Sequence, residues 1–586
     1  MLIMRFCSLF SFVFSFAVSA HAQDPEISIS GKVLDERTRQ PVPYAHIRNA
    51  ANRQGTISNT EGFFQLNAHA LGDTLVVSFT GYDKQYIAVR DFRPGQEILL
   101  LPQSQLLESV NVTRAGTSYL YDLLTACGRK IPDVTKTAKT YYELESFVDN
   151  QQAELISMYY NGDFSGYEIK ALHLKNARID LAAHDQRLFI SAESSNALRM
   201  FQLFGRNEWF PENPFGIRKS ALPSKYKLSL DQKYRNENGH AIYVIDFMPR
   251  AENGKYFQGK VWIDSLESCI LRIVLKAPDA AIHPFVALHL DSLQRVDLEI
   301  TQTFDRQGGL TFLNHLDFKY DVWYKILNQA GKKQRISHAD SVYRVSTRAV
   351  LYAYDYENAF LLPQFRFFES GMYHDYRNGC FYNPYFWTEI DEFKLRERGE
   401  GKLLFIRDSA DISNRDAFAG GNSGRQGLLE HPYVIWGQKR IRFRTQEAPP
   451  ETGTPADLYH FEVQLYMDLN PAPEGVNMLT RVVLDPFESH FRFPPTDTAA
   501  LCFLNLYFDL MEIHRRELEV EVRRGPMEIV RIRELYQQRL RQMQTTGKTF
   551  LKETERGGNK KALEKWNRYV YERLGIDNLA YFGLYQ

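Results

Sequence analysis

The sequence lacks most of the features that assign a function directly. Its 586 residues hold 71 Lys and Arg against 71 Asp and Glu, so the formal net charge is zero. A nucleic-acid-binding protein needs a surplus of basic residues to displace counterions, and this balance argues against a nucleic-acid partner. The motifs H-E-x-x-H, C-x-x-C and G-x-S-x-G do not occur. We therefore predict no catalytic residue, no metal site and no cofactor, and we favour a protein that is not an enzyme.

Cysteine is scarce, and long apolar segments are missing after the first residues. Apart from Cys7, the chain has four cysteines more than 100 residues apart: Cys127, Cys269, Cys380 and Cys502. This spacing gives no small-domain disulfide framework, so we expect buried thiols. Beyond residue 22 no run of about 18 uncharged apolar residues occurs, and we predict no transmembrane helix.

Residues 1–22 have the pattern of a secretory signal peptide. Arg5 gives a positive start, Leu9 to Val18 is apolar, and Ala20-His21-Ala22 fits a cleavage site. We expect an exported protein whose mature chain starts at Gln23. An uncleaved anchor is the alternative.

From Ile27 to Thr113 the chain shows short alternating strands separated by turn residues. They include Ile27–Val33, Tyr44–Arg48, Phe63–Leu66, Thr74–Thr80, Glu97–Leu101 and Val110–Val112. Seven short strands at such spacing are typical of a small β-sandwich.

The same region contains landmarks in a fixed order: Gly31-Lys32-Val33, Pro43, Gly55-Thr56-Ile57-Ser58, Glu61-Gly62-Phe63-Phe64, Gly81-Tyr82 and Leu107–Val112. Together they resemble the carboxypeptidase-regulatory-like domain, a transthyretin-like β-sandwich of envelope proteins in Bacteroidetes-type bacteria. The resemblance implies a non-catalytic accessory domain. We expect the glycines at turns or close backbone approaches, and Phe63 and Tyr82 in the sandwich core.

The family's name raises the question of a zinc carboxypeptidase. The only H-x-x-E motif is His514-Arg515-Arg516-Glu517, in a predicted helix, and no His follows it as a third ligand. We therefore reject the peptidase interpretation.

The middle of the chain is predicted as a second β-rich unit. After a short helix from Ser118 to Lys130 come long alternating runs, including Glu154–Tyr160, Ala241–Met248, Val296–Phe304 and Thr311–Tyr320. Within it, His240–Lys276 resembles the curved sheet of LolA-like lipoprotein-sorting folds. That resemblance implies a half-open sheet with an apolar inner face, but a closed sheet with helices packed on it is the favoured interpretation.

Aromatic residues gather between Tyr352 and Trp387, where they make up fourteen of 36 residues. Tyr352, Tyr354 and Tyr356 alternate, so we expect their rings on one face of a strand. A core or an inter-domain seam is the favoured interpretation. The alternative is a platform for a glycan or lipid ligand, formed by these three residues with Tyr385 and Trp387.

The last part of the chain changes to a helical period. We predict helices at Ala499–Arg523, after Pro526, and at Asn559–Leu574 with Gly575 as the stop. Between Glu512 and Lys561, 13 Lys and Arg stand against 8 Asp and Glu. This surplus would suit docking on anionic head groups, but we favour a solvated face with ion pairs along the helix.

The sequence thus predicts a mainly β (α+β) chain with a seven-stranded N-terminal β-sandwich, a larger β-rich middle and a helical C-terminal region. The predicted divisions are a signal peptide (1–22), the sandwich (23–113), a β-rich unit (114–345), an aromatic-rich β domain (346–495) and the helical region (496–586). We predict a non-catalytic protein of the periplasm or the periplasmic face of the outer membrane. Its sandwich would be an interaction or spacing module for other envelope proteins. A glycan- or lipid-binding protein is the first alternative and an unrecognised hydrolase the second, and the oligomeric state stays open.

Overall fold

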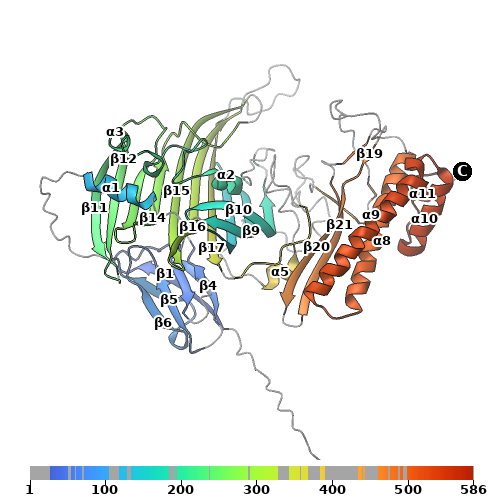
Figure 1. Ribbon diagram of the computed structural model, residues 1–586, viewed down its shortest axis with the longest axis horizontal. Helices are drawn as coiled ribbons and strands as arrows, with labels where there is room; N and C mark the ends of the chain where they lie inside the picture. Colours follow the sequence, from blue (N-terminus) through green and yellow to red (C-terminus); the bar gives the residue numbers. More distant parts are fainter. Residues whose placement is uncertain are drawn as a thin grey trace, which may run out of the picture. The chain divides into compact units, whose positions relative to one another are not determined.

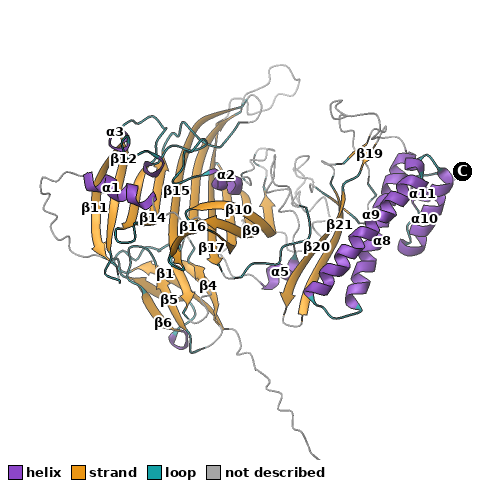
Figure 2. Cartoon of the chain, viewed as in Figure 1, coloured by secondary structure: helices purple, strands orange, loops and turns teal. Residues whose placement is uncertain are grey.

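The computed structural model describes residues 27–584 except 51–54, 60, 69–70, 104–117, 129–133, 183, 185–190, 192–193, 237, 288–290, 327–341, 357, 367–382, 390–432, 438–439, 442–458, 473–474, 486–488 and 492–497. The predicted signal peptide and the predicted strand Val110–Val112 lie outside the described residues. The chain divides near Pro102 into two compact units. Figure 2 shows the strand-rich N-terminal and middle parts and the helices of the C-terminal part, which confirms the predicted fold class.

The first unit contains seven strands (Figure 1). They are β1 (Ile27–Asp35), β2 (His46–Asn49), β3 (Gly55–Ile57), β4 (Phe63–Ala68), β5 (Thr74–Ser78), β6 (Gln85–Ala88) and β7 (Gln96–Leu100). One sheet has the order β4-β1-β7 and the other the order β3-β2-β5-β6. Val33 and Phe64 from the first sheet share a core with Ile47 and Val77 from the second. The predicted seven-stranded β-sandwich is therefore confirmed.

Two of the glycine landmarks lie where a side chain would collide with backbone. Gly62 has a φ of +81°, and a Cβ there would lie 2.4 Å from the carbonyl oxygen of Val33. A Cβ on Gly31 would lie 2.7 Å from the carbonyl oxygen of Gln96 in the neighbouring strand β7. Only Gly fits such close approaches. The remaining landmarks follow the chain in order, with Pro43 and Gly81 in turns and Gly55 at the start of β3.

Phe64 rather than Phe63 enters the sandwich core. Phe64 and Leu66 are core residues, whereas Phe63 is half-buried, with the Lys32 Nζ 4.9 Å from the centroid of its ring. The expectation for Phe63 was wrong because side chains alternate along β4, and the next residue points inward. Tyr82 packs against the core as expected, and its hydroxyl donates to Asp35 Oδ2 at 2.8 Å.

The second unit contains a ten-stranded antiparallel sheet in the order β10-β9-β8-β17-β16-β15-β14-β13-β12-β11 (Figure 1). Strand β17, the last of these strands along the chain, pairs with β8. This pairing joins the hairpins β8-β9-β10 and the meander from β11 to β17 into one sheet. The strands are β8 (Thr135–Val148), β9 (Gln151–Ser165), β10 (Glu168–Leu181), β11 (Tyr226–Arg235), β12 (Ala241–Pro249), β13 (Gln258–Asp264), β14 (Cys269–Ala277), β15 (Ser292–Gln307), β16 (Leu310–Lys325) and β17 (Val342–Asp355).

Both faces of this sheet bury side chains. On one, here called the inner face, helices α1 (Ser118–Cys127) and α2 (Ser194–Met200) join the largest apolar core of the described chain. A short helix α3 (Leu222–Lys225) leads into β11. The opposite, outer face carries a row that runs in register across β16, β17, β8, β9 and β10: His315, Tyr352, Tyr141, Tyr159 and Asn176. All five of these residues are buried.

The C-terminal part combines a small sheet with helices. The sheet has the order β18-β21-β20, and β19 pairs with β22. The elements are α5 (Pro384–Glu389), β18 (Val434–Ile435), β19 (Tyr459–His460), β20 (Val463–Ala472), β21 (Gly475–Leu484), β22 (His490–Phe491), α8 (Thr498–Arg523), α9 (Ile529–Glu553), α10 (Lys560–Leu574) and α11 (Asn578–Tyr581). Leu465, Val482, Leu510 and Phe550 belong to the core that joins strands and helices. The predicted helical region is confirmed.

Three of the four predicted thiols lie among the described residues. Cys127, Cys269 and Cys502 are buried, as expected, and Cys380 lies outside the described residues. In the described part of the chain, no helix has the length and apolar character needed to cross a membrane.

Candidate functional site

Tyr352 and Tyr354, the first two residues of the predicted aromatic platform, lie close together on β17. Their ring centroids are 5.9 Å apart, with Tyr352 1% exposed and Tyr354 half-buried. Tyr352 is in register with Tyr141, whose ring lies 5.0 Å from that of Tyr159. These rings belong to the packing of the outer face.

Tyr356 lies on the other side of the sheet. Its hydroxyl donates to the carbonyl oxygen of Leu313 at 2.5 Å, and its ring lies 6.0 Å from Phe164 and 5.8 Å from Phe312. Both phenylalanines belong to the inner-face core. The expectation that the three tyrosines share one face was wrong, because a register shift between Ala353 and Asp355 interrupts the alternation.

The two remaining platform residues lie on α5. Trp387 is 4% exposed, and its Nε1 donates to Asn176 Oδ1 at 2.7 Å. The guanidinium carbon of Arg178 lies 3.8 Å from the centroid of the Trp387 ring, a close cation–π contact. Tyr385 is 47% exposed. The structure therefore brings Tyr352 and Tyr354 together but does not gather the five rings on one exposed surface.

A buried ion pair joins the large sheet to the C-terminal strands near Trp387. Lys175 of β10 and Asp468 of β20 have side chains 2% and 0% exposed, with Nζ and Oδ1 2.5 Å apart. The same Nζ donates to the carbonyl oxygens of Leu361 (2.7 Å) and Leu469 (3.0 Å), while Asp468 Oδ2 accepts from Asn383 Nδ2 at 2.7 Å. Burial lowers the pKa of Lys175 and raises that of Asp468, and their mutual attraction opposes both changes.

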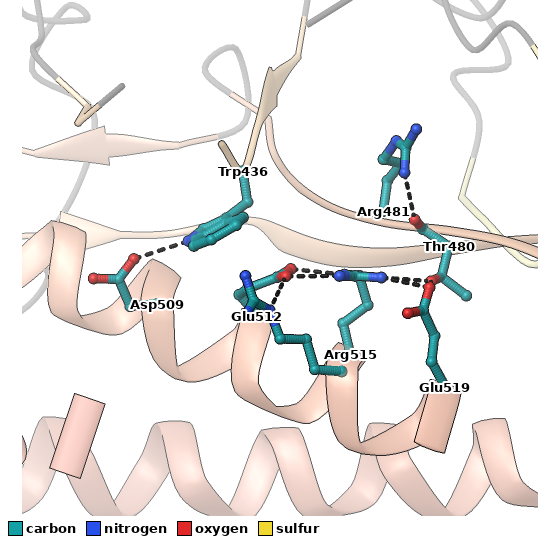
Figure 3. Close-up of polar contacts among 8 residues, drawn as sticks. Trp436, Thr480, Arg481, Asp509, Glu512, Arg515 and Glu519 are labelled. Atoms are coloured by element: carbon teal, nitrogen blue, oxygen red, sulfur yellow. Dashed lines mark hydrogen bonds and ion pairs between the residues drawn. The ribbon is translucent and has the colours of Figure 1, made fainter. Parts of the chain in front are cut away.

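A second polar network lies between α8 and β21 (Figure 3). Glu512, Arg515 and Glu519 share one face of α8 because they are spaced three and four residues apart. Arg515 donates to Glu512 Oε2 at 2.7 Å and to Glu519 Oε1 at 2.6 Å, and Glu519 Oε1 also accepts from Thr480 at 2.7 Å. Burial alone would lower the pKa of Arg515, but the two carboxylates hold it above its usual value.

The network continues one turn earlier along α8. The fully buried Asp509 accepts hydrogen bonds from Trp436 Nε1 (2.8 Å), Arg440 Nη1 (2.6 Å) and Asn578 Nδ2 (2.7 Å). Arg481 of β21 is directed away from α8 (Figure 3), and burial together with the charge of Arg515 lowers its pKa. These contacts fix α8 against β21 and so hold the other polar face of the helix in a set position.

That other face forms a groove with α9. The groove has a volume of about 850 Å³. It is lined by residues from Ile513 to Arg524, at the end of α8 and in the turn after it, by residues of α9 between Gln538 and Thr546, and by the end of α10 at Arg573 and Leu574.

Buried ionic contacts hold the two walls of the groove together. Arg539 of α9 is 5% exposed and bonds to Glu517 and, at 2.8 Å from Nη2, to Glu521, both on α8. His514 Nε2 lies 2.9 Å from Thr546 Oγ1. Burial lowers the pKa of His514, which favours its neutral form. The one base-and-carboxylate motif noted in the sequence, His514-x-x-Glu517, is thus part of a helix–helix contact.

Arginine dominates the charge around the groove. Five arginines line it against two glutamates, and both glutamates are already bonded to Arg539. Arg516 pairs with Glu512 at 3.0 Å. Within the described residues, Arg524, Arg541 and Arg573 have no ion-pair partner, and Arg573 stacks at 3.7 Å on the ring of Tyr569.

The sequence showed the basic surplus of this region but not the groove. A groove needs the relative placement of three helices, which a single-helix pattern does not contain. The available indication was the four-residue spacing of Arg516, Val520 and Arg524 near the end of the predicted helix. The aromatic segment gave a stronger compositional signal, yet among its described residues Tyr352, Phe386 and Trp387 are buried.

Together, the sandwich, the ten-stranded sheet and the C-terminal helices define a two-unit, mainly β protein with a polar groove between α8 and α9. Residues 29–112 match the model of the CarboxypepD_reg-like domain. The first unit is therefore a domain of this family, as its landmarks predict. The match covers this domain and not the rest of the chain.

Curated proteins include no match to the chain. Solved structures that resemble it include a putative outer membrane lipoprotein-sorting protein domain from Vibrio parahaemolyticus, with 12% identity over 40% of this chain and 90% of that chain and a TM-score of 0.18. A chain in the structure of the MucA/MucB complex of Pseudomonas aeruginosa has 10% identity over 40% of this chain and 93% of its own length, with a TM-score of 0.15. A LolA superfamily protein from Nitrosomonas europaea has 8% identity over 41% and 93%, with a TM-score of 0.16. They include the LolA-like type that His240–Lys276 resembles, but TM-scores this low say nothing about function.

Proposed function

We propose that this chain is an exported, non-catalytic protein of the cell envelope whose N-terminal β-sandwich is an interaction or spacing module. One observation carries the proposal: the CarboxypepD_reg-like domain forms a compact unit of its own at the start of the chain. A separately folded accessory domain can contact a partner without any change in the larger unit. The signal-like pattern of residues 1–22 supports export to the periplasm or to the periplasmic face of the outer membrane.

The surface of the sandwich offers a place for such a contact. Strand β6 is an edge of the four-stranded sheet, and an edge strand presents backbone groups that another chain can pair with. Tyr86, in the middle of β6, is 64% exposed. Aromatic side chains of this kind are enriched in protein–protein interfaces.

Export is tested by fractionation of cells that produce the full chain, followed by mass spectrometry of the N-terminal peptide. We expect the protein in the envelope or periplasmic fraction with Gln23 as its first residue. Recovery from the cytosol with residues 1–22 still attached would contradict the proposal.

The interaction role is tested by placing a photo-crosslinking amino acid at position 86 in the exported chain. The matched control carries it at Val286 of the larger unit, which is 81% exposed. We expect a discrete envelope-protein adduct from position 86 and none from position 286. Adducts of equal yield from both positions, or none from either, would remove the interaction role and leave spacing as the function of the domain.

A further inference from the structure

The groove between α8 and α9 has the composition of a ligand-binding surface rather than of a solvated helix face. Salt bridges along a solvated face pair most charges with neighbours on the same helix. Here Arg524, in the turn directly after α8, Arg541 of α9 and Arg573 of α10 line the same cavity and have no ion-pair partner within the described part of the chain. Three unpaired cations around one groove create a local positive potential that attracts carboxylates.

The floor of the groove compensates only part of this positive charge. Its two carboxylates, Glu517 and Glu521, both bond to the buried Arg539. Arg516 of α8, also on the rim, is held by the carboxylate of Glu512, which does not line the groove. With Glu512 counted, five arginines stand against three carboxylates, which leaves a surplus of two positive charges, and burial lowers the pKa of His514 and so favours its neutral form.

We propose that this groove is a docking site for an acidic polypeptide segment of a partner protein. The proposal goes beyond the proposed function of the sandwich, because it concerns the opposite end of the chain and a different surface.

The shape of the groove favours a polypeptide over a small anion. Arg516 and Val520 of α8 and Arg524, in the turn that follows it, are four residues apart along one wall, so they extend over about 12 Å at the rise of a helix. Cations spread over that length match successive carboxylates of a peptide, whereas a phosphate group needs donors that converge on one point. Val520, 47% exposed between the two arginines, offers a contact to one apolar side chain of the ligand.

The residue types also favour carboxylate ligands over a lipid surface. Guanidinium groups bind carboxylates through two parallel hydrogen bonds, which gives direction as well as attraction. A membrane surface is flat on this scale and contacts convex, apolar-studded faces, whereas these arginines line a hollow between two helices.

The test uses the mature full-length chain and a fluorescein-labelled peptide of about ten residues, with alternating Glu and Asp around a central Leu. Fluorescence anisotropy at low salt is expected to show saturable binding. The triple variant Arg524→Gln, Arg541→Gln, Arg573→Gln is expected to bind the peptide about 10- to 100-fold more weakly. Each lost arginine–carboxylate pair is exposed and should weaken binding by about two- to fivefold.

The matched control variant removes the same amount of charge from α8 and α9 outside the groove: Arg523→Gln, Arg533→Gln and Lys548→Gln, all three exposed. Both variants are checked by circular dichroism and thermal unfolding. We expect the control to bind like the wild type, because its cations do not line the cavity.

Several outcomes would overturn the proposal. One is equal weakening in the control variant, which would mean general charge attraction. Another is equal binding of a peptide in which Gln and Asn replace the acids. Full displacement by millimolar inorganic phosphate, or binding to phosphatidylglycerol vesicles but not to the peptide, would assign the groove to a phosphate or lipid ligand instead.

Discussion

Lys175 and Asp468 form the most completely buried ion pair between the ten-stranded sheet and the C-terminal strands in the described chain, and removing one member alone should be costly. The perturbation is Lys175→Met, which keeps the length and apolar stem of the side chain but removes the ammonium group. Asp468 would then stay buried with Asn383 as its remaining side-chain donor.

The structure gives the magnitude of this effect. Loss of one partner of a buried pair costs about 3–5 kcal/mol, because the other charge stays desolvated. The double variant Lys175→Met, Asp468→Leu removes both charges and leaves mainly the carbonyl oxygens of Leu361 and Leu469 without their donor. We expect that variant to cost about 1–3 kcal/mol, less than Lys175→Met alone.

Tryptophan fluorescence during urea unfolding reports the stability of the larger structural unit, which contains the ion pair. All six Trp of the chain lie after Pro102 and thus in the larger unit: Trp209, Trp262, Trp323, Trp387, Trp436 and Trp566. The matched control is Lys170→Met on the same strand. Lys170 pairs with Glu168 at 2.6 Å, but its side chain is 50% exposed, and such a pair contributes about 1 kcal/mol or less.

Two results would refute this reasoning. If Lys175→Met costs no more than Lys170→Met, the buried pair does not hold the seam. If the double variant costs as much as the sum of its two single variants, the two charges do not act as a pair.

Two further perturbations test the pH dependence and the sandwich. Glu154 is fully buried, and burial raises its pKa from 4.5 to about 7 while the Ser191 N–H partly opposes the change. The folded state therefore holds this proton more tightly, and stability falls as the pH rises from about 4.5 to about 7, by about 3 kcal/mol. Glu154→Gln should remove that loss and raise the urea midpoint at pH 8 but not at pH 4, and a parallel pH profile in both proteins would contradict it. Gly62→Ala should destabilise the sandwich by more than Gly81→Ala. A Cβ at position 62 would lie 2.4 Å from the Val33 carbonyl oxygen. A Cβ at position 81 would have nothing within 4 Å, so Gly81→Ala should cost only the strain of the left-handed backbone (φ +94°), about 1–2 kcal/mol. Hydrogen exchange of residues 27–101 by mass spectrometry distinguishes the two variants, and equal effects would mean that the contact at Gly62 relaxes.

Local patterns were enough to predict the sandwich and the helices. Gly31 and Gly62 occupy positions that only Gly tolerates, so their order along the chain is a direct consequence of the backbone path. The helix ends at Arg523 and Leu574 follow from Gly525 and Gly575, and Gly575 does adopt a left-handed φ of +70°. The division of the rest of the chain into domains stays a prediction.

Single-residue alternation could not be predicted from the sequence. In β4 the neighbours Phe63 and Phe64 are equally apolar, and only the pairing with β1 decides which of them enters the core. On β17 a register shift moves Tyr356 to the inner face, away from Tyr352 and Tyr354. Both errors arise because strand register is a property of pairs of strands, whereas the pattern was taken from one strand at a time.

The same reasoning explains why composition pointed to the aromatic segment instead of the groove. A sheet that buries both faces needs large side chains on both, and Trp387, Tyr159 and Tyr352 supply them on the outer face. Aromatic enrichment there is a consequence of two-sided burial. In the helical part, the charged side chains that have no ion-pair partner indicate a candidate site better than the composition does. Arg515 and Arg539 stand in the same basic segment as Arg541, yet the fold uses the first two to join helices and strands and leaves the third at the cavity. Candidate ligand-binding cations in a neutral protein are thus the ones that the fold leaves without an ion pair, and finding them requires the positions of all three helices.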